Sequence, residues 1–232
     1  MGIRAGRTLF EANGSHVFVY AATKNRGKLA ELRAIFSEAG WTIEESALYI
    51  DVVEGDVSYT DNAALKARTL HAALVKAGRR AAVIGDDSGL EVAALDGRPG
   101  VLSARYGGAS ATWAQRRRTL LEEVDGSGSI DRAARFVCAL HHIDARGLES
   151  AVIDSFPGRL ATHERGGGGF SYDAVFIPDD RSETFAQISE AEKNTISHRA
   201  RAARRLLEAI RSREPVAMGR SSDFEEAGPA AM

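Results

Sequence analysis

Short apolar runs alternate with polar segments along most of the chain. Residues 17–20, Val-Phe-Val-Tyr, are typical of a buried strand, and the polar segment 23–28 follows them. Apolar side chains then recur at the spacing of one helix face until Gly40, at Leu29, Leu32, Ile35, Phe36 and Ala39. This part of the sequence predicts a strand, a polar loop and a helix.

A second helix is predicted at about 61–77 and a buried strand at 81–84. Thr60 or Asp61 is the expected N-cap, and Gly78 ends the helix. The sequence Asp86-Asp87-Ser88-Gly89 is interpreted as a turn at the carboxyl end of the strand. Ligands of open α/β sheets bind outside the carboxyl ends of strands, so we expect this turn and segment 23–28 to face one site.

The second half of the chain changes the sheet from parallel to mixed. A polar helix is expected near 110–124, and two long strands at 132–143 and 148–160 are joined by a short turn that favours an antiparallel hairpin. A final amphipathic helix begins near Ser197. The fold class is therefore predicted to be α/β with a mixed sheet.

Length and composition set the limits of this fold. The 232 residues, 44% of them hydrophobic, suffice for one core or for two lobes that share a cleft. We expect a flexible extension at 1–15, one domain at 16–212 and a disordered tail at 213–232. The formal net charge of -2 gives no general attraction to DNA or to a membrane.

Targeting features are few. The single cysteine, Cys138, lies in an apolar run, which excludes an intramolecular disulfide and suggests a buried thiol in a reducing compartment. Neither a secretory signal nor a run of membrane-spanning length is found in the sequence. A cytoplasmic location is predicted.

Two segments carry candidate phosphate and metal chemistry. Segment 23–28 offers backbone amides at a helix start together with Thr23, Asn25 and Lys28, which could hold phosphate oxygens; a simple capped helix start is the alternative. Asp86 and Asp87, with Glu54 from an acidic stretch, could supply carboxylate oxygens to Mg²⁺. An aspartate-rich turn explains Asp86 and Asp87 equally well.

Candidate substrate contacts lie in the C-terminal half. The glycine-rich approach to 169–173 lets backbone fit closely around a ligand, and Phe170 or Tyr172 offers an aromatic face for a base. Lys193 and the helix start at 197–199 could contact phosphate or a purine oxygen. Each has a plain structural alternative, respectively a flexible loop and a solvated helix face.

Adjacent His141 and His142 are expected on opposite faces of a strand, so they should not chelate one ion.

The ordered set of motifs resembles the inosine triphosphate pyrophosphatase (Ham1-like) family. The resemblance runs from about residue 17 to 211. It is carried by Ala22-Thr23-Lys24-Asn25 and Lys28, Asn62 and Lys66-Ala67-Arg68, Asp86-Asp87-Ser88-Gly89-Leu90, Pro99-Gly100 and Ser103-Ala104-Arg105-Tyr106, Gly169-Phe170 and Tyr172-Asp173, and Glu192-Lys193 with Ser197-His198-Arg199. Lys24 and Ser171 stand where family members often carry glycine.

The resemblance implies a homodimer with an elongated mixed sheet and a cleft between two lobes. It also implies Mg²⁺-dependent hydrolysis of ITP, dITP and XTP to the monophosphate and pyrophosphate, which removes these nucleotides before they enter DNA or RNA. Asp87 would be general base and metal ligand, and Glu54 the second ligand, although Asp51 and Asp56 leave its register open. The implied substrate-binding residues are Thr23, Lys24, Asn25, Arg26, Gly27, Lys28, Lys66, Ser88, Phe170, Ser171, Tyr172, Asp173, Lys193, His198 and Arg199.

The expected mechanism is attack of water on the α-phosphorus, with Asp87 taking a proton and lysines balancing the charge of pyrophosphate. Donors facing the 6-oxo group of the purine would reject adenine. Three alternatives stay open: an enzyme for pyrimidine or modified nucleotides, a non-catalytic nucleotide sensor, and nucleic-acid binding through arginines at 116–118 and 199–205.

Overall fold

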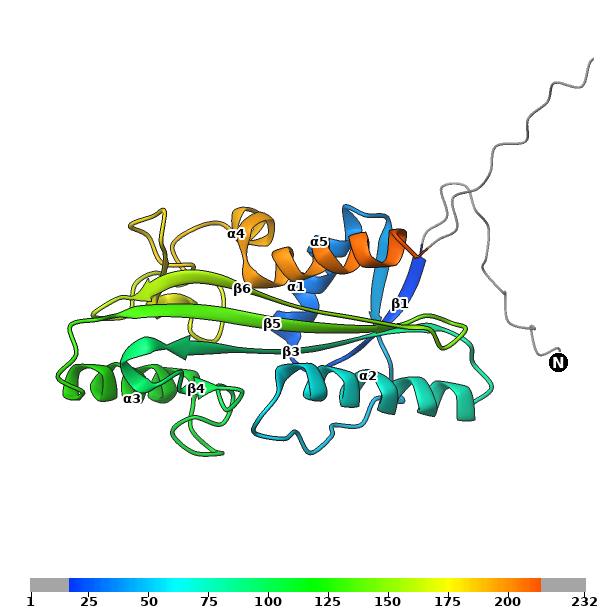
Figure 1. Cartoon of the computed structure of the whole chain (residues 1–232), viewed down its shortest axis with the longest axis horizontal. Coiled ribbons are helices and arrows are strands. Elements are labelled where there is room, and N and C mark those ends of the chain that lie inside the picture. The colour runs from blue at the N-terminus through cyan, green and yellow to red at the C-terminus, as the bar shows by residue number, and fades with distance from the viewer. Residues whose placement is uncertain (1–16, 214–232) are drawn as a thin grey trace, which may run out of the picture.

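The computed structural model describes residues 17–213, which form a long mixed sheet with helices on both faces. Figure 1 shows α1, α4 and α5 on one side of the sheet and α2 and α3 on the other. The strands of this part of the chain are β1 (Val17–Ala22), β2 (Trp41–Glu45), β3 (Ala82–Val92), β4 (Pro99–Gly100), β5 (Ala133–Ile143), β6 (Glu149–Leu160) and β7 (Phe176–Pro178). The helices are α1 (Arg26–Ser37), α2 (Tyr59–Lys76), α3 (Trp113–Gly126), α4 (Glu190–Ile196) and α5 (His198–Arg211), with 3₁₀ turns at Ala93–Leu95 and Asp173–Val175.

The sheet has the order β2-β1-β3-β5-β6-β7, and β4 pairs with β3. β1 lies parallel to β2 and β3, whereas β3, β5, β6 and β7 pair antiparallel in turn. The predicted mixed sheet and the β5–β6 hairpin are thereby confirmed.

The two largest clusters of the apolar core lie toward opposite ends of the sheet, and two smaller ones pack α2 against it. One large cluster packs α1 and α5 against the sheet around Leu32, Phe36 and Leu206. The other gathers α3 with aromatic side chains that include Phe136 and Phe176. This division agrees with the predicted two lobes.

The structure of β3 contradicts the turn predicted at 86–89. The predicted turn Asp86-Asp87-Ser88-Gly89 is wrong, because these residues continue the strand and pair with Leu140, Ala139, Cys138 and Val137 of β5. The parallel partner β1 ends at Ala22, opposite Gly85, while the antiparallel partner β5 continues. The loop after β1 therefore lies beside Asp86 and Asp87, as expected, although β3 itself does not end there.

Gly85 explains how closely α2 approaches this point of β3. A Cβ atom at Gly85 would lie 2.2 Å from the carbonyl oxygen of Ala63 and 3.0 Å from the nitrogen of Ala67. Only glycine allows backbone to meet backbone at that distance. Side chains of the buried face of α2 are thus brought onto the central strand.

Other element predictions differ at their ends. α2 begins two residues earlier than expected and is capped by Ser58, whose Oγ accepts from the Asp61 N–H at 3.1 Å. α1 ends at Ser37 before the predicted stop at Gly40. The short elements β2 and α4 were not predicted at all. The predicted extension at 1–15 lies outside the described residues, as does the predicted tail except for Arg213.

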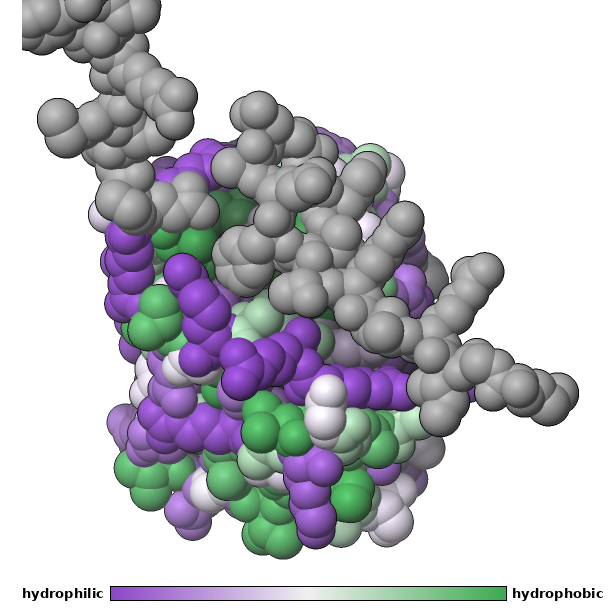
Figure 2. Space-filling view, turned by 90° about the vertical axis from the view of Figure 1, so that its right-hand side faces the viewer, coloured by the Kyte–Doolittle hydropathy of each residue, from purple (hydrophilic) through white to green (hydrophobic). Residues whose placement is uncertain are grey.

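Cys138 is buried and unpaired, as predicted. Among residues 17–213, no helix has the length and apolar character needed to cross a membrane. Hydrophilic side chains alternate with apolar ones on the visible part of the molecular end drawn in Figure 2.

Candidate active site

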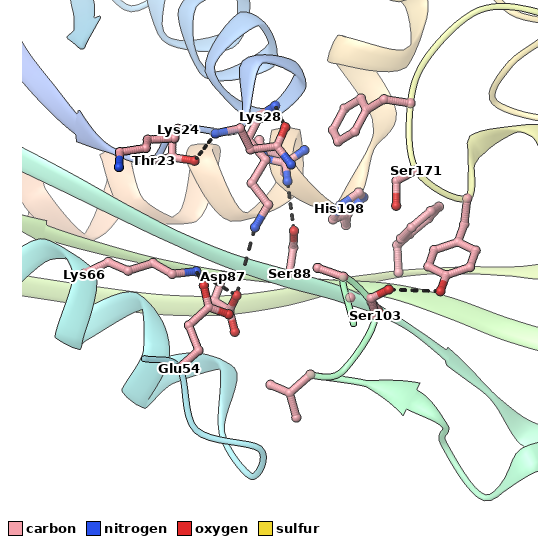
Figure 3. Close-up of a pocket in the computed structure, with 18 of the residues that line it drawn as sticks. Thr23, Lys24, Lys28, Glu54, Lys66, Asp87, Ser88, Ser103, Ser171 and His198 are labelled. Atoms are coloured by element: carbon pink, nitrogen blue, oxygen red, sulfur yellow. Dashed lines mark hydrogen bonds and ion pairs between the residues drawn. The ribbon is translucent and has the colours of Figure 1, made fainter. Parts of the chain in front are cut away.

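A cleft lies between the two largest clusters of the core, above the middle of β3. Its lining residues come, among others, from β3, from the loops after β1 and β4, and from α5, and together with the open mouth the space between them amounts to about 870 Å³. In Figure 3, Glu54, Lys66 and Asp87 lie together at one end, while His198 and Ser171 lie beyond Ser88 at the other.

The start of α1 borders the first end. Asn25 caps the helix, since its Oδ1 accepts from the Lys28 N–H at 3.1 Å, and Thr23 Oγ1 accepts from the Asn25 N–H at 3.1 Å. The loop is therefore held by its own side chains. Thr23, Lys24, Asn25 and Lys28 line this end of the cleft, so the start of α1 lies beside it.

Asp87 lies at the centre of a group of polar side chains. Its Oδ1 is 3.0 Å from Lys66 Nζ and 4.0 Å from Lys28 Nζ, and its Oδ2 accepts from Asn62 Nδ2 at 3.1 Å. Lys66 also lies 2.7 Å from Glu54 Oε1. Burial favours the neutral amine, but Asp87 and Glu54 outweigh it and raise the pKa of Lys66, so this lysine is charged.

Asp86 points to the opposite side of β3 from Asp87. Its Oδ1 lies 2.6 Å from Lys28 Nζ, and its Oδ2 accepts from Arg199 Nε at 2.7 Å. Burial alone would favour the protonated acid; Arg199 and Lys28 nevertheless hold the pKa of this carboxyl far below its usual range. Asp86 is therefore a permanent anion between the cations of α1 and α5.

The ion pairs continue toward the second end of the cleft. Arg199 Nη1 contacts Glu31 of α1, and Glu31 Oε1 lies 2.7 Å from Lys193 Nζ. Lys193 also contacts Asp173 and lies 4.8 Å from the ring centre of Phe170. Burial raises the pKa of Asp173, and the nearby Lys193 opposes that shift.

The second end combines aromatic rings with a buried imidazole. His198 stacks on Phe136 with ring centres 4.6 Å apart and planes 11° apart. Burial, aided by Arg199 and Lys193, lowers the pKa of His198 well below its ordinary value, so the ring is neutral. Its Nδ1 is buried and has no hydrogen-bond partner among the described residues, which leaves a nitrogen able to contact a ligand.

The glycine-rich loop closes this end. Ser171 has φ +59°, a left-handed conformation that favours glycine, and its carbonyl accepts from Arg117 Nη1 at 2.8 Å. Tyr172 donates to the carbonyl of Ser103 at 3.0 Å and meets Trp113 edge-on. The Phe170 ring packs over Gly27, where any Cβ would lie 2.7 Å from ring carbons.

The structure brings nearly all the predicted site residues to this cleft. Of the predicted set, Arg26 and Gly27 are not among its lining residues: Arg26 is exposed, and Gly27 lines a neighbouring cavity behind Phe170. Sequence reasoning missed Glu31 and the lining residues Tyr49, Val101, Trp113 and Phe136. Ser103 and Ala104 also line the cleft; they were part of a recognised motif but had been given no role in the site. A carboxylate four residues before Ile35, on the buried face of a predicted helix, is a signal by which Glu31 could have been found.

The paired histidines and two of the arginines considered for nucleic-acid binding can also be placed. His141 bonds Glu149, and His142 lies against Trp41, so the two histidines do face apart, as predicted. Arg116 is buried and donates to the carbonyls of Tyr106 and Gly108, and Arg199 is buried as well. These two arginines are therefore not part of a basic surface for nucleic acid.

A magnesium site would have to be built from two carboxylates. No group of three or more His, Cys, Asp or Glu side chains arranged for a metal occurs within residues 17–213. Glu54 and Asp87 nevertheless converge on Lys66 Nζ at 2.7 and 3.0 Å. Mg²⁺ commonly takes one or two carboxylates and completes its shell with water and phosphate oxygens, so this donor pair fits the ion.

The sequence of the chain is similar to those of proteins of one family. Residues 19–209 match the model of the Ham1 family. The chain is 43% identical over 196 residues to a dITP/XTP pyrophosphatase of Mycolicibacterium paratuberculosis, covering 82% of this chain and 93% of that protein. A dITP/XTP pyrophosphatase of Geobacillus kaustophilus is 41% identical over 192 residues, covering 81% and 91%.

Solved structures agree with the sequence matches. A HAM1 protein from Coxiella burnetii superposes with a TM-score of 0.73 at 29% identity, covering 84% of this chain and 99% of that chain. A nucleoside-triphosphatase, also described as a dITP/XTP pyrophosphatase, from Mycobacterium abscessus gives 0.62 at 35% identity, covering 82% and 99%. The elongated α/β fold is therefore shared with these proteins.

Proposed function

The chain belongs to the Ham1 family, and we propose that it hydrolyses the triphosphates of hypoxanthine and xanthine nucleosides to the monophosphate and pyrophosphate. One observation of the site carries this proposal. A single cleft joins a charged end, with Lys28, Lys66 and Asp87, to an end with an unpartnered buried imidazole and aromatic rings. A triphosphate with a purine base has the same two chemical ends.

In the proposed reaction, Lys28 and Lys66 bind phosphate oxygens together with the N–H groups at the start of α1. A carboxylate oxygen of Asp87 accepts the proton of the water that attacks the α-phosphorus. Asn62 and Lys66 hold this carboxylate in place, at 3.1 and 3.0 Å. Catalysis is then mainly positioning and balancing of charge.

Magnesium is part of the proposal because of the charge of the site. The four cations Lys28, Lys66, Lys193 and Arg199 already pair with carboxylates, so a triphosphate brings negative charge that they do not fully balance. Glu54 and Asp87 would hold Mg²⁺, which would supply the missing positive charge at the phosphates. The observation in favour is the convergence of these two carboxylates.

Selectivity for a 6-oxo purine is proposed to depend on His198. The neutral ring carries one N–H, and with that proton on Nδ1 it donates to a 6-oxo group but finds a second donor in the amino group of adenine. A site built to pair one polar group rejects the mismatched analogue by roughly 10⁴–10⁵ at best. Phe170 and Trp113 line the cleft and offer aromatic surface to the base.

A homodimer is proposed from the family resemblance. Light scattering coupled to size exclusion measures the mass directly, and a monomer at micromolar concentration contradicts this part of the proposal.

The reaction is tested by following its products in H₂¹⁸O. With ITP and Mg²⁺ we expect equimolar IMP and pyrophosphate, with the label in IMP because water attacks the α-phosphorus. Label in pyrophosphate, or release of inorganic phosphate, contradicts the reaction. Binding of ITP with no product identifies a nucleotide sensor instead.

A further inference from the structure

The segment that carries Glu54 has little apolar packing to hold it. Residues 50–57 form no helix or strand, and Val53 and Val57 are 93% and 87% exposed. A short stretch without buried side chains has a low local stability unless polar contacts fix it. The position of Glu54 relative to Asp87 therefore depends on such contacts.

The side chains of the segment pair with Lys66 and Lys24, at Glu54 and Asp51. Its backbone is held by Asn62, from the first turn of α2. The Asn62 side chain is 2% exposed and bonds both backbone groups of Gly55, accepting from the N–H at 2.8 Å and donating to the carbonyl at 3.1 Å. The same Nδ2 donates to Asp87 Oδ2 at 3.1 Å. One amide thus connects the residue after Glu54 with the central carboxylate.

This arrangement uses the whole amide group. Oδ1 accepts once and Nδ2 donates twice, so the amide cannot turn over without placing its oxygen against Asp87 Oδ2 and the Gly55 carbonyl. Aspartate has the same shape but lacks both donors. Asparagine at position 62 can therefore make all three hydrogen bonds, whereas aspartate cannot.

Arg105 fixes the same backbone from the other side. Its Nη2 donates to the Gly55 carbonyl at 3.1 Å and its Nη1 to the Glu54 carbonyl at 3.4 Å. This arginine belongs to the loop after β4, remote in sequence from both α2 and the acidic segment. Two separate elements therefore converge on the peptide groups of Glu54 and Gly55.

We propose that Asn62 is a positioning residue that fixes the Glu54 segment against Asp87, with Arg105 as its second anchor. Asn62 touches neither substrate nor metal in this account; it sets the separation of the two carboxylates that would hold Mg²⁺. The consequence for metal binding rests on the proposed function, whereas the consequence for the backbone of Gly55 does not.

The backbone consequence is tested by amide hydrogen exchange of the full chain, without nucleotide or metal. In Asn62→Ala the Gly55 amide loses its acceptor, and we expect it to exchange about tenfold faster or more. Arg105→Ala is expected to raise the same rate by a smaller factor. Arg68→Ala is the matched control, because that arginine lies on α2 but pairs with Glu149, and its Gly55 rate should equal that of the wild type.

The metal consequence is tested by titrating Mn²⁺ into each variant, followed by electron paramagnetic resonance, and by steady-state kinetics. In Asn62→Ala we expect Mn²⁺ affinity to fall about 10- to 100-fold, as for other residues that orient metal ligands. The Mg²⁺ concentration for half-maximal rate should rise by a similar factor, with KM for ITP at saturating Mg²⁺ within about twofold of wild type. A purely structural role would not separate these two constants.

Unchanged exchange at Gly55 in Asn62→Ala overturns the proposal, and so does unchanged Mn²⁺ affinity in a protein whose wild type binds Mn²⁺. An equal effect of Arg68→Ala also overturns it. If the wild type binds no Mn²⁺ and hydrolyses no nucleotide, the proposed function fails, and the Gly55 exchange rate alone then decides the role of Asn62.

Discussion

Arg199 Nε donates to Asp86 Oδ2 at 2.7 Å, and each residue is at most 1% exposed. Lys28 reaches the other oxygen of Asp86, so this carboxylate connects α1, β3 and α5 beneath the cleft. From the sequence, Asp86 was one of three carboxylates that could bind Mg²⁺, together with Asp87 and Glu54. In the structure it is instead the carboxylate that Lys28 and Arg199 share.

Asp86→Asn is therefore expected to destabilise the fold. The variant removes the carboxylate that Lys28 and the buried Arg199 share and leaves Arg199 with Glu31 as its one carboxylate partner. Breaking one partner of a buried ion pair typically costs about 3–5 kcal/mol. Urea denaturation at pH 7 measures the change in unfolding free energy. A loss below about 1 kcal/mol would contradict the role assigned to Asp86.

Asp87→Asn should separate binding from chemistry. Asparagine keeps the size of the side chain but is a far weaker base, so we expect turnover of ITP to fall by about 10²–10⁴. Nucleotide affinity, measured by calorimetry, should change much less. Wild-type turnover in this variant would contradict the assignment of Asp87 as the proton acceptor.

His142 gives a prediction about pH. It is buried against Trp41, and burial lowers its pKa to about 4. Because the folded state resists protonation, the stability from this residue is present above the unfolded pKa of about 6.5 and is lost as pH falls toward 4. From pH 7 to pH 5 the loss is about 2 kcal/mol.

His142→Leu should remove this part of the pH dependence. Urea denaturation at pH 7 and pH 5 compares the variant with the wild type, in which His141 and His198 contribute in the same direction. We expect the decrease in stability to be smaller in the variant by about 2 kcal/mol. Equal decreases in both proteins would contradict the buried, neutral state of His142.

Ser171 occupies a left-handed conformation at φ +59°. That conformation destabilises an L-residue by roughly 1–2 kcal/mol. Glycine relieves this strain but loses more chain entropy on folding, so Ser171→Gly should stabilise the folded protein by up to about 1 kcal/mol. Ser127→Gly is a control, since Ser127 has φ −71°. If Ser171→Gly destabilises the protein, the serine side chain contributes more to the stability of the fold than its left-handed backbone conformation costs, and the prediction is wrong.

The sequence predicted those features that depend on local patterns. The helix α1 follows from the spacing of Leu29, Leu32 and Phe36, and the hairpin of β5 and β6 follows from two long apolar runs with a short turn. The end of β3 could not be predicted in this way. Asp86 and Asp87 have turn-like composition, and only pairing with the distant β5 keeps them in a strand.

The same limit applies to the site. Segment 23–28, Lys66 and Asp87 could be named from motifs. Trp113, by contrast, lines the cleft, and Glu31 pairs with Lys193 and Arg199, only because elements far apart in sequence pack together. Asn62 belonged to a recognised motif, but its role depends on a contact with Gly55 that no spacing rule contains. Polar networks of this kind need tertiary structure to be seen.

The most direct test of the proposed function is pyrophosphate release from ITP, XTP, GTP, ATP, dUTP and dTTP, with and without Mg²⁺. We expect ITP and XTP to be hydrolysed only with Mg²⁺, and kcat/KM for ATP to be lower by at least about 10². Equal rates for ITP, XTP, GTP and ATP, a preference for dUTP or dTTP, or full activity in EDTA would contradict it.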